Sequence, residues 1–211
     1  MGAIMSKRFA ELAFTEAVKR QQERHGSRAA YARMEQWGEA GDRLGDFERE
    51  FLEGRDGFYM GSVTETGWPY IQYRGGKKGF LKVLDAQTLG FADLRGNKQY
   101  ISVGNLEKDD KVALFFMDYA RQERLKILGR ARVVEDGPEA ERLLAELRVP
   151  GEKSPAERAV VIAVEAFDWN CPQHITPRYT QEELADALEP MRKKMEELEA
   201  EVKRLRMAKS A

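Results

Sequence analysis

Residues 89–106 read LGFADLRGNKQYISVGNL, and this stretch carries most of the information about the fold. It begins as an apolar strand, passes through a polar connection, and is expected to continue as a short helix that begins near Lys98. Gly96, Asn97 and Lys98 combine a permissive backbone, amide donors and a point charge, which together could hold a phosphate. A solvated turn of the same composition is the commoner explanation of this triplet by itself.

Strand-like segments lie on both sides of this stretch. They read FYMGSVT (58–64), WPYIQYRGG (68–76), KVALFFMDY (111–119), RLKILGRARVV (124–134) and AVVIAVEAFDW (159–169). Turns rich in Gly, Asp or Lys separate most of them, which is typical of a small antiparallel barrel. The sequence therefore predicts a mainly β domain over residues 55–179, with one further helix that begins at Pro138.

Helical segments precede the predicted barrel. Two capped helices are expected to end at Gly26 and Gly38, and a third is expected to start at Asp46 with Phe47 on its apolar face. Residues 1–54 are therefore predicted to form a helical lead-in to the barrel.

The composition limits the possible classes of function. With 35 Lys+Arg against 36 Asp+Glu the net charge is −1, so no global attraction to nucleic acid or membrane is expected. No stretch approaches the roughly 20 apolar residues of a spanning helix. The one cysteine, Cys171, forms no internal disulfide, which fits a cytoplasmic protein. Cys171 and His174 alone are too few ligands for zinc, and no metal site or nucleophilic dyad is predicted.

Residues 180–211 are expected to form a charged helix that begins with a capping box of Thr180 and Glu183. Its apolar residues follow alternating steps of four and three, a heptad seam made of Leu184, Leu188, Met191, Met195, Leu198, Val202 and Leu205. Pro190 predicts a kink, or a new helix that starts there. The seam is expected to pack on the barrel or its dimer mate rather than to form a free coiled coil.

Four segments in this order resemble the pyridoxamine 5'-phosphate oxidase-like family of FMN-binding split barrels. They are GWPYIQYRGG (67–76), LGFADLRGNKQYISVGNL (89–106), DDKVALFFMDY (109–119) and RLKILGRARVV (124–134). The resemblance covers roughly residues 47–179, and the helical lead-in and the NCPQHITPR loop look like a bacterial flavin-nucleotide-binding branch of the family. It implies a split β-barrel with N-terminal helices and a long C-terminal helix. It also implies a homodimer that holds one FMN in each of two clefts at the interface.

The resemblance also implies roles for individual residues. It places the FMN phosphate at Gly96, Asn97 and Lys98. The flavin ring would lie against two strands, at the positions that correspond here to Gln72, Tyr73, Arg74, Gly75, Phe91 and Ala92. An arginine of the partner subunit would approach the cofactor, and Arg124 occupies that position here. The substrate side would be bordered by Trp169, His174 and Arg178.

The implied function is an FMN-dependent oxidoreductase that passes electrons between a small donor and a small acceptor. Oxidation of vitamin B6 itself is not expected, because Asn97 replaces one of two adjacent basic residues of the oxidase proper and its C-terminal arginine-and-histidine motif is absent. Two alternatives stay open. One is a flavin-binding or sensing module without turnover, which the heptad helix favours. The other is a related split barrel that holds F420 or haem.

Overall fold

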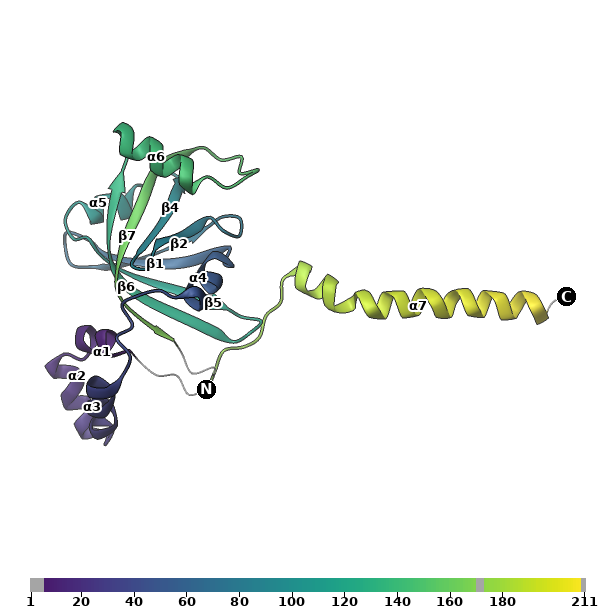
Figure 1. Cartoon of the computed structure of the whole chain (residues 1–211), viewed down its shortest axis with the longest axis horizontal. Helices are drawn as coiled ribbons and strands as arrows, with labels where there is room; N and C mark the ends of the chain where they lie inside the picture. The colour runs from purple at the N-terminus through teal and green to yellow at the C-terminus, as the bar shows by residue number, and fades with distance from the viewer. Residues whose placement is uncertain (1–5, 170–172, 210–211) are drawn as a thin grey trace.

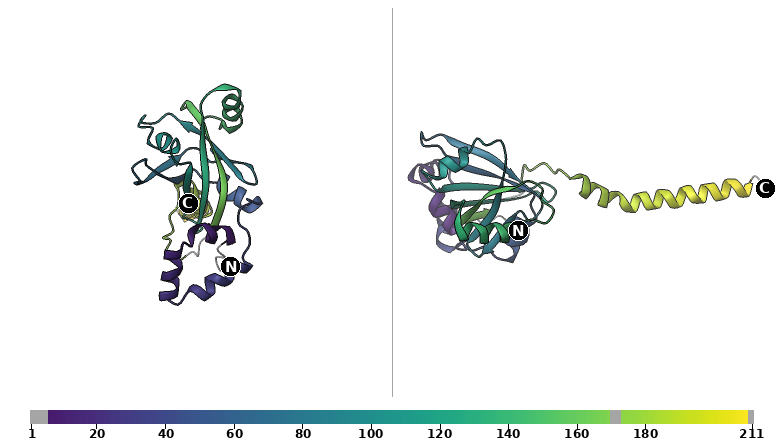
Figure 2. Two further views of the ribbon diagram at one scale, coloured as in Figure 1. Left: turned by 90° about the vertical axis from the view of Figure 1, so that its left-hand side faces the viewer. Right: turned by 90° about the horizontal axis from the view of Figure 1, so that it is seen from above.

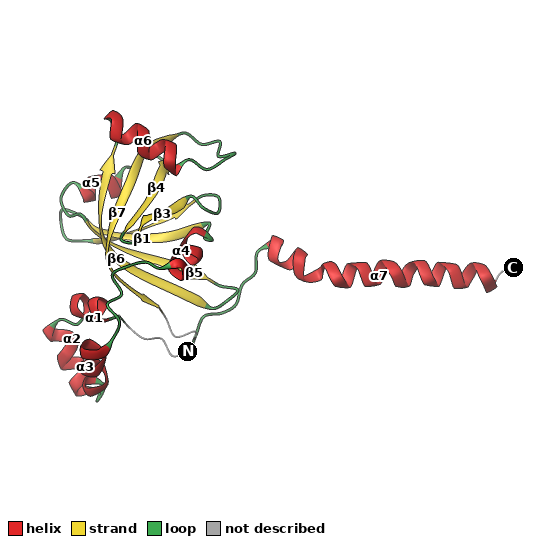
Figure 3. Cartoon of the chain, in the orientation of Figure 1, coloured by secondary structure: helices red, strands yellow, loops and turns green. Residues whose placement is uncertain are grey.

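The computed structural model describes residues 6–169 and 173–209. The described residues form a seven-stranded antiparallel sheet with flanking helices (Figure 3). The strands are β1 (Gly57–Val63), β2 (Pro69–Gly75), β3 (Leu81–Asp85), β4 (Thr88–Leu94), β5 (Lys111–Asp118), β6 (Glu123–Val134) and β7 (Ala156–Trp169), in the spatial order β2-β1-β5-β6-β7-β4-β3. The sequence did not predict β3, a strand of only five residues.

The helices are α1 (Lys7–Ala13), α2 (Glu16–Arg24), α3 (Arg28–Trp37), α4 (Asp46–Glu53), α5 (Ile101–Leu106), α6 (Gly137–Leu147) and α7 (Gln181–Lys209). The predicted helices α2, α3 and α4 are confirmed, and α1 was not foreseen. The Thr15 hydroxyl accepts the Val18 N–H at 3.4 Å and caps α2. Phe47 of α4 was expected on a buried face but is 60% exposed, because Phe51 and Leu52 fill that face of the helix.

The sheet curls around an aromatic core but does not close, so the barrel is split (Figure 1). Phe58 of β1 lies 4.9 Å from Phe116 and 5.5 Å from Phe91 of β4, measured between ring centroids. β1 and β4 are not neighbours in the sheet, so this contact requires the sheet to fold back on itself. The predicted mainly β fold and split barrel are therefore confirmed.

α4 covers the free edge of β3. Arg49 Nη1 donates to the Val83 carbonyl oxygen at 2.6 Å, and the Val83 N–H donates to Glu53 Oε1 at 3.1 Å. These side chains bind the backbone groups that an edge strand otherwise exposes to another chain. α4 therefore protects one edge of the split barrel.

α6 forms a second small apolar layer outside the sheet. Its buried Leu143 and Leu147 pack with Ala159 and Val161 of β7. The two faces of β7 are thus both buried, one against the barrel core and one against α6. This explains why its sequence is apolar almost throughout.

α7 projects away from the barrel in the right-hand view of Figure 2 and contributes no buried residue. The predicted capping box is confirmed, since the Thr180 N–H donates to Glu183 at 2.8 Å and the Glu183 N–H donates to Thr180 Oγ1 at 3.2 Å. The helix runs continuously through Pro190, so a new helix does not begin there. No helix in the described part of the chain is both long and apolar enough to span a bilayer.

Candidate functional site

A polar cavity of about 190 Å³ lies where β2, β4 and α5 meet. β2 contributes Gln72 and Arg74, β4 contributes Asp93, the connection after β4 contributes Lys98, and β7 contributes Glu157. β2 and β4 lie near opposite edges of the sheet, so they meet at this cavity because the split barrel curls. The period of two along β2 then turns Gln72 and Arg74 toward the same face.

Arg74 links the two sides of the split. Its Nη1 lies 2.6 Å from Asp93 Oδ1, and both side chains are nearly buried, 14% and 12% exposed. Arg158 of β7 approaches the second carboxylate oxygen of Asp93 at 3.6 Å. Burial raises the pKa of Asp93 above its ordinary value, and the two guanidinium groups offset part of that rise. Two cations thus surround one carboxylate at the inner end of the cavity.

The Nε atom of Arg74 is buried and has no hydrogen-bond partner among the described residues. A buried guanidinium donor without an acceptor costs free energy, and an anion that enters the cavity would satisfy it. The hydrogen bond from Arg74 Nη1 to Asp93 uses only part of the N–H donors of the guanidinium group. Arg74 therefore has donor capacity left for a ligand.

Glu157 forms a second charged cluster at the rim. Its carboxylate accepts from Arg95 Nε at 2.9 Å and from Arg158 Nη2 at 3.1 Å. The hydrogen bond from Arg95 is the main reason why the pKa of Glu157 lies below its ordinary value. Both acidic groups of the cavity are thus already paired with arginines, so they do not leave it with an uncompensated negative charge.

The connection that closes the cavity has an unusual backbone. Lys98 and Tyr100 have φ values of 61° and 53°, in the left-handed region. Asn97 Oδ1 accepts the Gln99 N–H at 3.2 Å, an Asx turn that holds the loop. The helix expected to begin near Lys98 begins instead at Ile101, because this turn intervenes. Lys98 remains exposed at the cavity mouth.

Gln72 is held from two sides. Its Oε1 accepts from the Ser102 hydroxyl at 3.0 Å and from the Tyr70 hydroxyl at 3.3 Å. Ser102 belongs to α5 and is 2% exposed, so the helix and β2 together fix the position of the Gln72 amide. Gln72 is therefore a rigid polar group in the cavity wall.

The structure brings together only part of the predicted set of cofactor residues. The cavity is lined by five of them, Gln72, Arg74, Gly96, Asn97 and Lys98. Tyr73 points to the opposite face of β2, where it lies 5.5 Å from the ring of Tyr59. Phe91 is 1% exposed in the barrel core. Gly75, Ala92 and Arg124 also do not line the cavity, and the Arg124 guanidinium lies 5.5 Å from the Phe115 ring on β5.

The residues predicted for the substrate side are dispersed. Trp169 Nε1 donates to Glu48 at 2.9 Å, which ties the end of β7 to α4. His174 is exposed with a φ of 67°, and the Arg178 guanidinium lies 4.9 Å from the Tyr119 ring. Cys171 lies outside the described residues. Within residues 6–169 and 173–209, no cluster of three or more His, Cys, Asp or Glu side chains could hold a metal ion.

Sequence reasoning missed the inner charged cluster. Asp93 and Arg158 are charged residues at the ends of strongly apolar strands, and both are buried. That combination was the available signal, because a charge in a buried strand needs a partner. The partners could not be named from the sequence, since they lie on three different strands.

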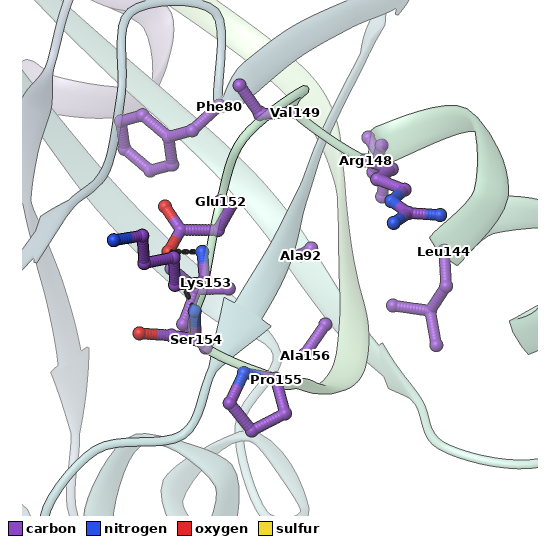
Figure 4. A pocket seen from close by; sticks show the side chains of 12 residues that line it. Phe80, Ala92, Leu144, Arg148, Val149, Glu152, Lys153, Ser154, Pro155 and Ala156 are labelled. Carbon is purple, nitrogen blue, oxygen red and sulfur yellow. Dashed lines mark hydrogen bonds between the residues drawn. The ribbon is translucent and has the colours of Figure 1, made fainter.

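A second cavity of about 300 Å³ lies beside the first, between β4, α6 and the loop at 148–155 (Figure 4). Ala92 is in its wall, with Leu144 of α6 on the far side. Glu152 accepts the N–H groups of Lys153 and Ser154 at 2.8 Å and 2.9 Å, so the loop is held by its own carboxylate. The structure therefore separates Ala92 from Lys98 and places them in adjacent cavities.

Comparison with known proteins gives one family match. Residues 44–170 match the sequence model of the family described as pyridoxamine 5'-phosphate oxidase. No curated protein matches the chain.

Three solved structures are similar to part of this chain at low sequence identity. HupZ of Group A Streptococcus is 18% identical, with 64% of this chain and 100% of that chain covered and a TM-score of 0.48. An FMN-binding protein from Syntrophomonas wolfei is 13% identical, with 57% and 82% covered and a TM-score of 0.44. A protein from Clostridium acetobutylicum, related to general stress protein 26 and described as of the pyridoxinephosphate oxidase family, is 17% identical, with 60% and 86% covered and a TM-score of 0.44.

Proposed function

Because the chain belongs to the pyridoxamine 5'-phosphate oxidase family over residues 44–170, we propose that it is a flavoprotein that binds FMN and passes electrons between a small donor and a small acceptor. The observation that carries the proposal is the polar cavity, where a buried arginine with an unsatisfied donor faces a lysine-bearing loop. When bound, FMN supplies hydride and single-electron transfer, and the protein supplies binding and orientation.

The residues of the cavity fit the phosphate end of FMN. Arg74 offers its unpaired Nε, and Lys98 adds a flexible cation at the mouth. A Cβ at Gly96 would meet nothing within 4 Å, so the loop leaves open space there. Arginine and lysine donors form charge-assisted hydrogen bonds with phosphate oxygens, which are stronger than bonds between neutral groups. Gln72, fixed by α5, would donate or accept at a polar edge of the ligand.

The proposal is tested by titrating the full chain with FMN and, in parallel, with riboflavin and F420. FMN at 100 times its dissociation constant should stabilise the fold by about 2.7 kcal/mol, visible as a higher melting temperature and a shifted flavin absorbance. Riboflavin lacks the phosphate and should bind much more weakly if the cavity holds that group. A protein that responds to none of the three ligands contradicts the proposal. A response to F420 but not to FMN would identify the other cofactor.

Reduction of the bound flavin by a donor distinguishes an oxidoreductase from a module that only binds flavin. Addition of NADH or NADPH to the FMN complex without oxygen should bleach the flavin within minutes if the protein is an oxidoreductase. A flavin that binds tightly and stays oxidised with these donors favours the sensing module instead.

The proposed assembly is a homodimer through the outer face of β1, β2, β5 and β6. This face carries an almost wholly apolar groove of about 520 Å³. Tyr59, Ile71 and Tyr73 on and beside it are 42%, 69% and 56% exposed, an unusual display of apolar surface for a monomer. Arg124, packed on Phe115 in the groove, lies where a partner subunit would meet it. A second copy of the chain on this face would bury these side chains.

Ile71→Glu tests this interface, because it places a charge in the centre of the buried apolar surface. The mass is measured by light scattering on a chain that ends at Tyr179, since α7 buries no residue and meets the barrel through an exposed ion pair, Lys78 with Glu182 at 3.6 Å. We expect a dimer for the parent chain, a monomer for Ile71→Glu, and a dimer for the control Trp37→Glu, whose side chain is 84% exposed on α3. A monomeric parent chain would contradict the proposed interface.

A further inference from the structure

The apolar seam of α7 has no partner in the described part of the chain. Its seven residues are between 45% and 64% exposed. Most of the stability of a helix in a protein comes from packing its apolar face against another surface. Figure 1 shows α7 extending well clear of the barrel, so its own barrel does not cover the seam. The seam therefore does not pack on the barrel of its own chain, and its expected packing against a dimer mate stays a prediction.

The sequence of the seam matches a two-stranded coiled coil. Steps of three and four place Leu184, Met191, Leu198 and Leu205 at d positions and Leu188, Met195 and Val202 at a positions. In parallel coiled coils, a β-branched residue at a with leucine at d favours two strands, and Val202 and Leu205 follow that rule. Pro190 falls at a c position on the outer side of the helix, so it bends the helix without interrupting the seam.

The charges beside the seam complement those of a second copy of the same helix. In a parallel, in-register pair, each g residue faces the e residue five positions later in the partner. Lys194 at g would face Glu199 at e, and Glu201 at g would face Arg206 at e. Both pairings are attractive, and each occurs twice in a symmetric dimer. The helix therefore has the charge pattern required to bind itself.

We propose that residues 191–205 of α7 pair with the same residues of a second copy of this chain as a parallel, in-register coiled coil. This contact is separate from the outer sheet face and does not depend on flavin binding. The two copies would then be joined at two separate interfaces, one between the barrels and one between the C-terminal helices.

Disulfide trapping tests the pairing in the full-length chain. Cys171→Ser removes the natural thiol, and Leu205→Cys then places the single cysteine at a d position, where it faces its own copy in the proposed pair. Ala200→Cys is the matched control, because it lies at an f position on the outer side of the same helix. We expect rapid formation of a cross-linked dimer under mild oxidation for Leu205→Cys and little for Ala200→Cys. Equal cross-linking of the two variants would overturn the proposal.

Charge exchange in the Leu205→Cys background tests the direction of the helices. Lys194→Glu alone places two glutamates face to face and should slow cross-linking roughly fivefold, within the range of exposed ion pairs. Adding Glu199→Lys should restore the rate in a parallel pair. In an antiparallel pair Leu205 would face Leu188 rather than its own copy, so Leu205→Cys would hardly cross-link in any charge background. The double exchange would then also leave Lys194→Glu facing Glu201 and Glu199→Lys facing Arg192, both repulsive. Failure of the double variant to recover therefore overturns the parallel arrangement, and unchanged melting of the barrel verifies the fold of each variant.

Discussion

Replacing Lys98 with glutamate is expected to weaken FMN binding roughly 100-fold and to leave the melting temperature of the cofactor-free protein unchanged. The lysine is exposed at the mouth of the polar cavity and no described ion pair holds it, so the fold does not depend on it. A glutamate would remove a charge-assisted hydrogen bond to the phosphate and add repulsion. The measurement is an FMN titration followed by fluorescence, with riboflavin as a ligand without phosphate.

The matched control is Lys108→Glu, which makes the same charge change outside the cavity. Lys108 is 57% exposed and lies 3.5 Å from Glu65, a surface pair that contributes little to stability. Its FMN affinity should equal that of the parent protein. Tight FMN binding by Lys98→Glu would refute the phosphate assignment while leaving the family and the fold unaffected. An equal loss in both variants would show that net charge, rather than the position of Lys98, controls binding.

Phe58→Ala is expected to lower the free energy of unfolding by about 3–5 kcal/mol, the range for removal of a buried phenylalanine. Phe58 is 1% exposed and contacts Phe80, Phe91 and Phe116 at once. Because these rings come from different parts of the curled sheet, a cavity there weakens the contact that closes the split barrel. Urea unfolding followed by circular dichroism gives the change directly.

Phe47→Ala is the control for that measurement, since it removes the same ring from a position that is 60% exposed. Phe47 lies 5.0 Å from Trp169 between ring centroids, and the loss should stay below about 1.5 kcal/mol. Similar losses in the two variants would mean that the aromatic cluster around Phe58 is not the centre of the core. Because FMN adds stability of its own, both proteins are compared without the cofactor.

The predicted site and the structural site differ because of strand geometry. A family resemblance treats consecutive residues such as Gln72, Tyr73 and Arg74 as one set, but a strand turns alternate side chains to opposite faces. Gln72 and Arg74 face the polar cavity, whereas Tyr73 faces the apolar outer surface. Tyr73 would therefore contact a cofactor only through its backbone or through the assembled dimer. Its predicted role remains a proposal.

The local features of this protein were determined by the sequence itself. Residues close together in the chain specify a helix cap at Thr15, the period of two along β2 and the heptad seam of α7. These signals depend on the geometry of a single strand or helix, so a linear pattern is sufficient to predict them. The short β3 escaped prediction because five residues give too little periodic signal.

Only the tertiary structure decided which charges meet. Arg74, Asp93 and Arg158 come from β2, β4 and β7, and they join because the sheet curls until its outer strands approach each other. The curl results from packing the aromatic core, which depends on many contacts between residues distant in sequence. A local sequence pattern does not reveal those contacts. The phosphate-like triplet at Gly96 to Lys98 and the candidate Arg74 were both visible in the sequence, but the burial of Arg74 beside Asp93 became visible only in the folded barrel.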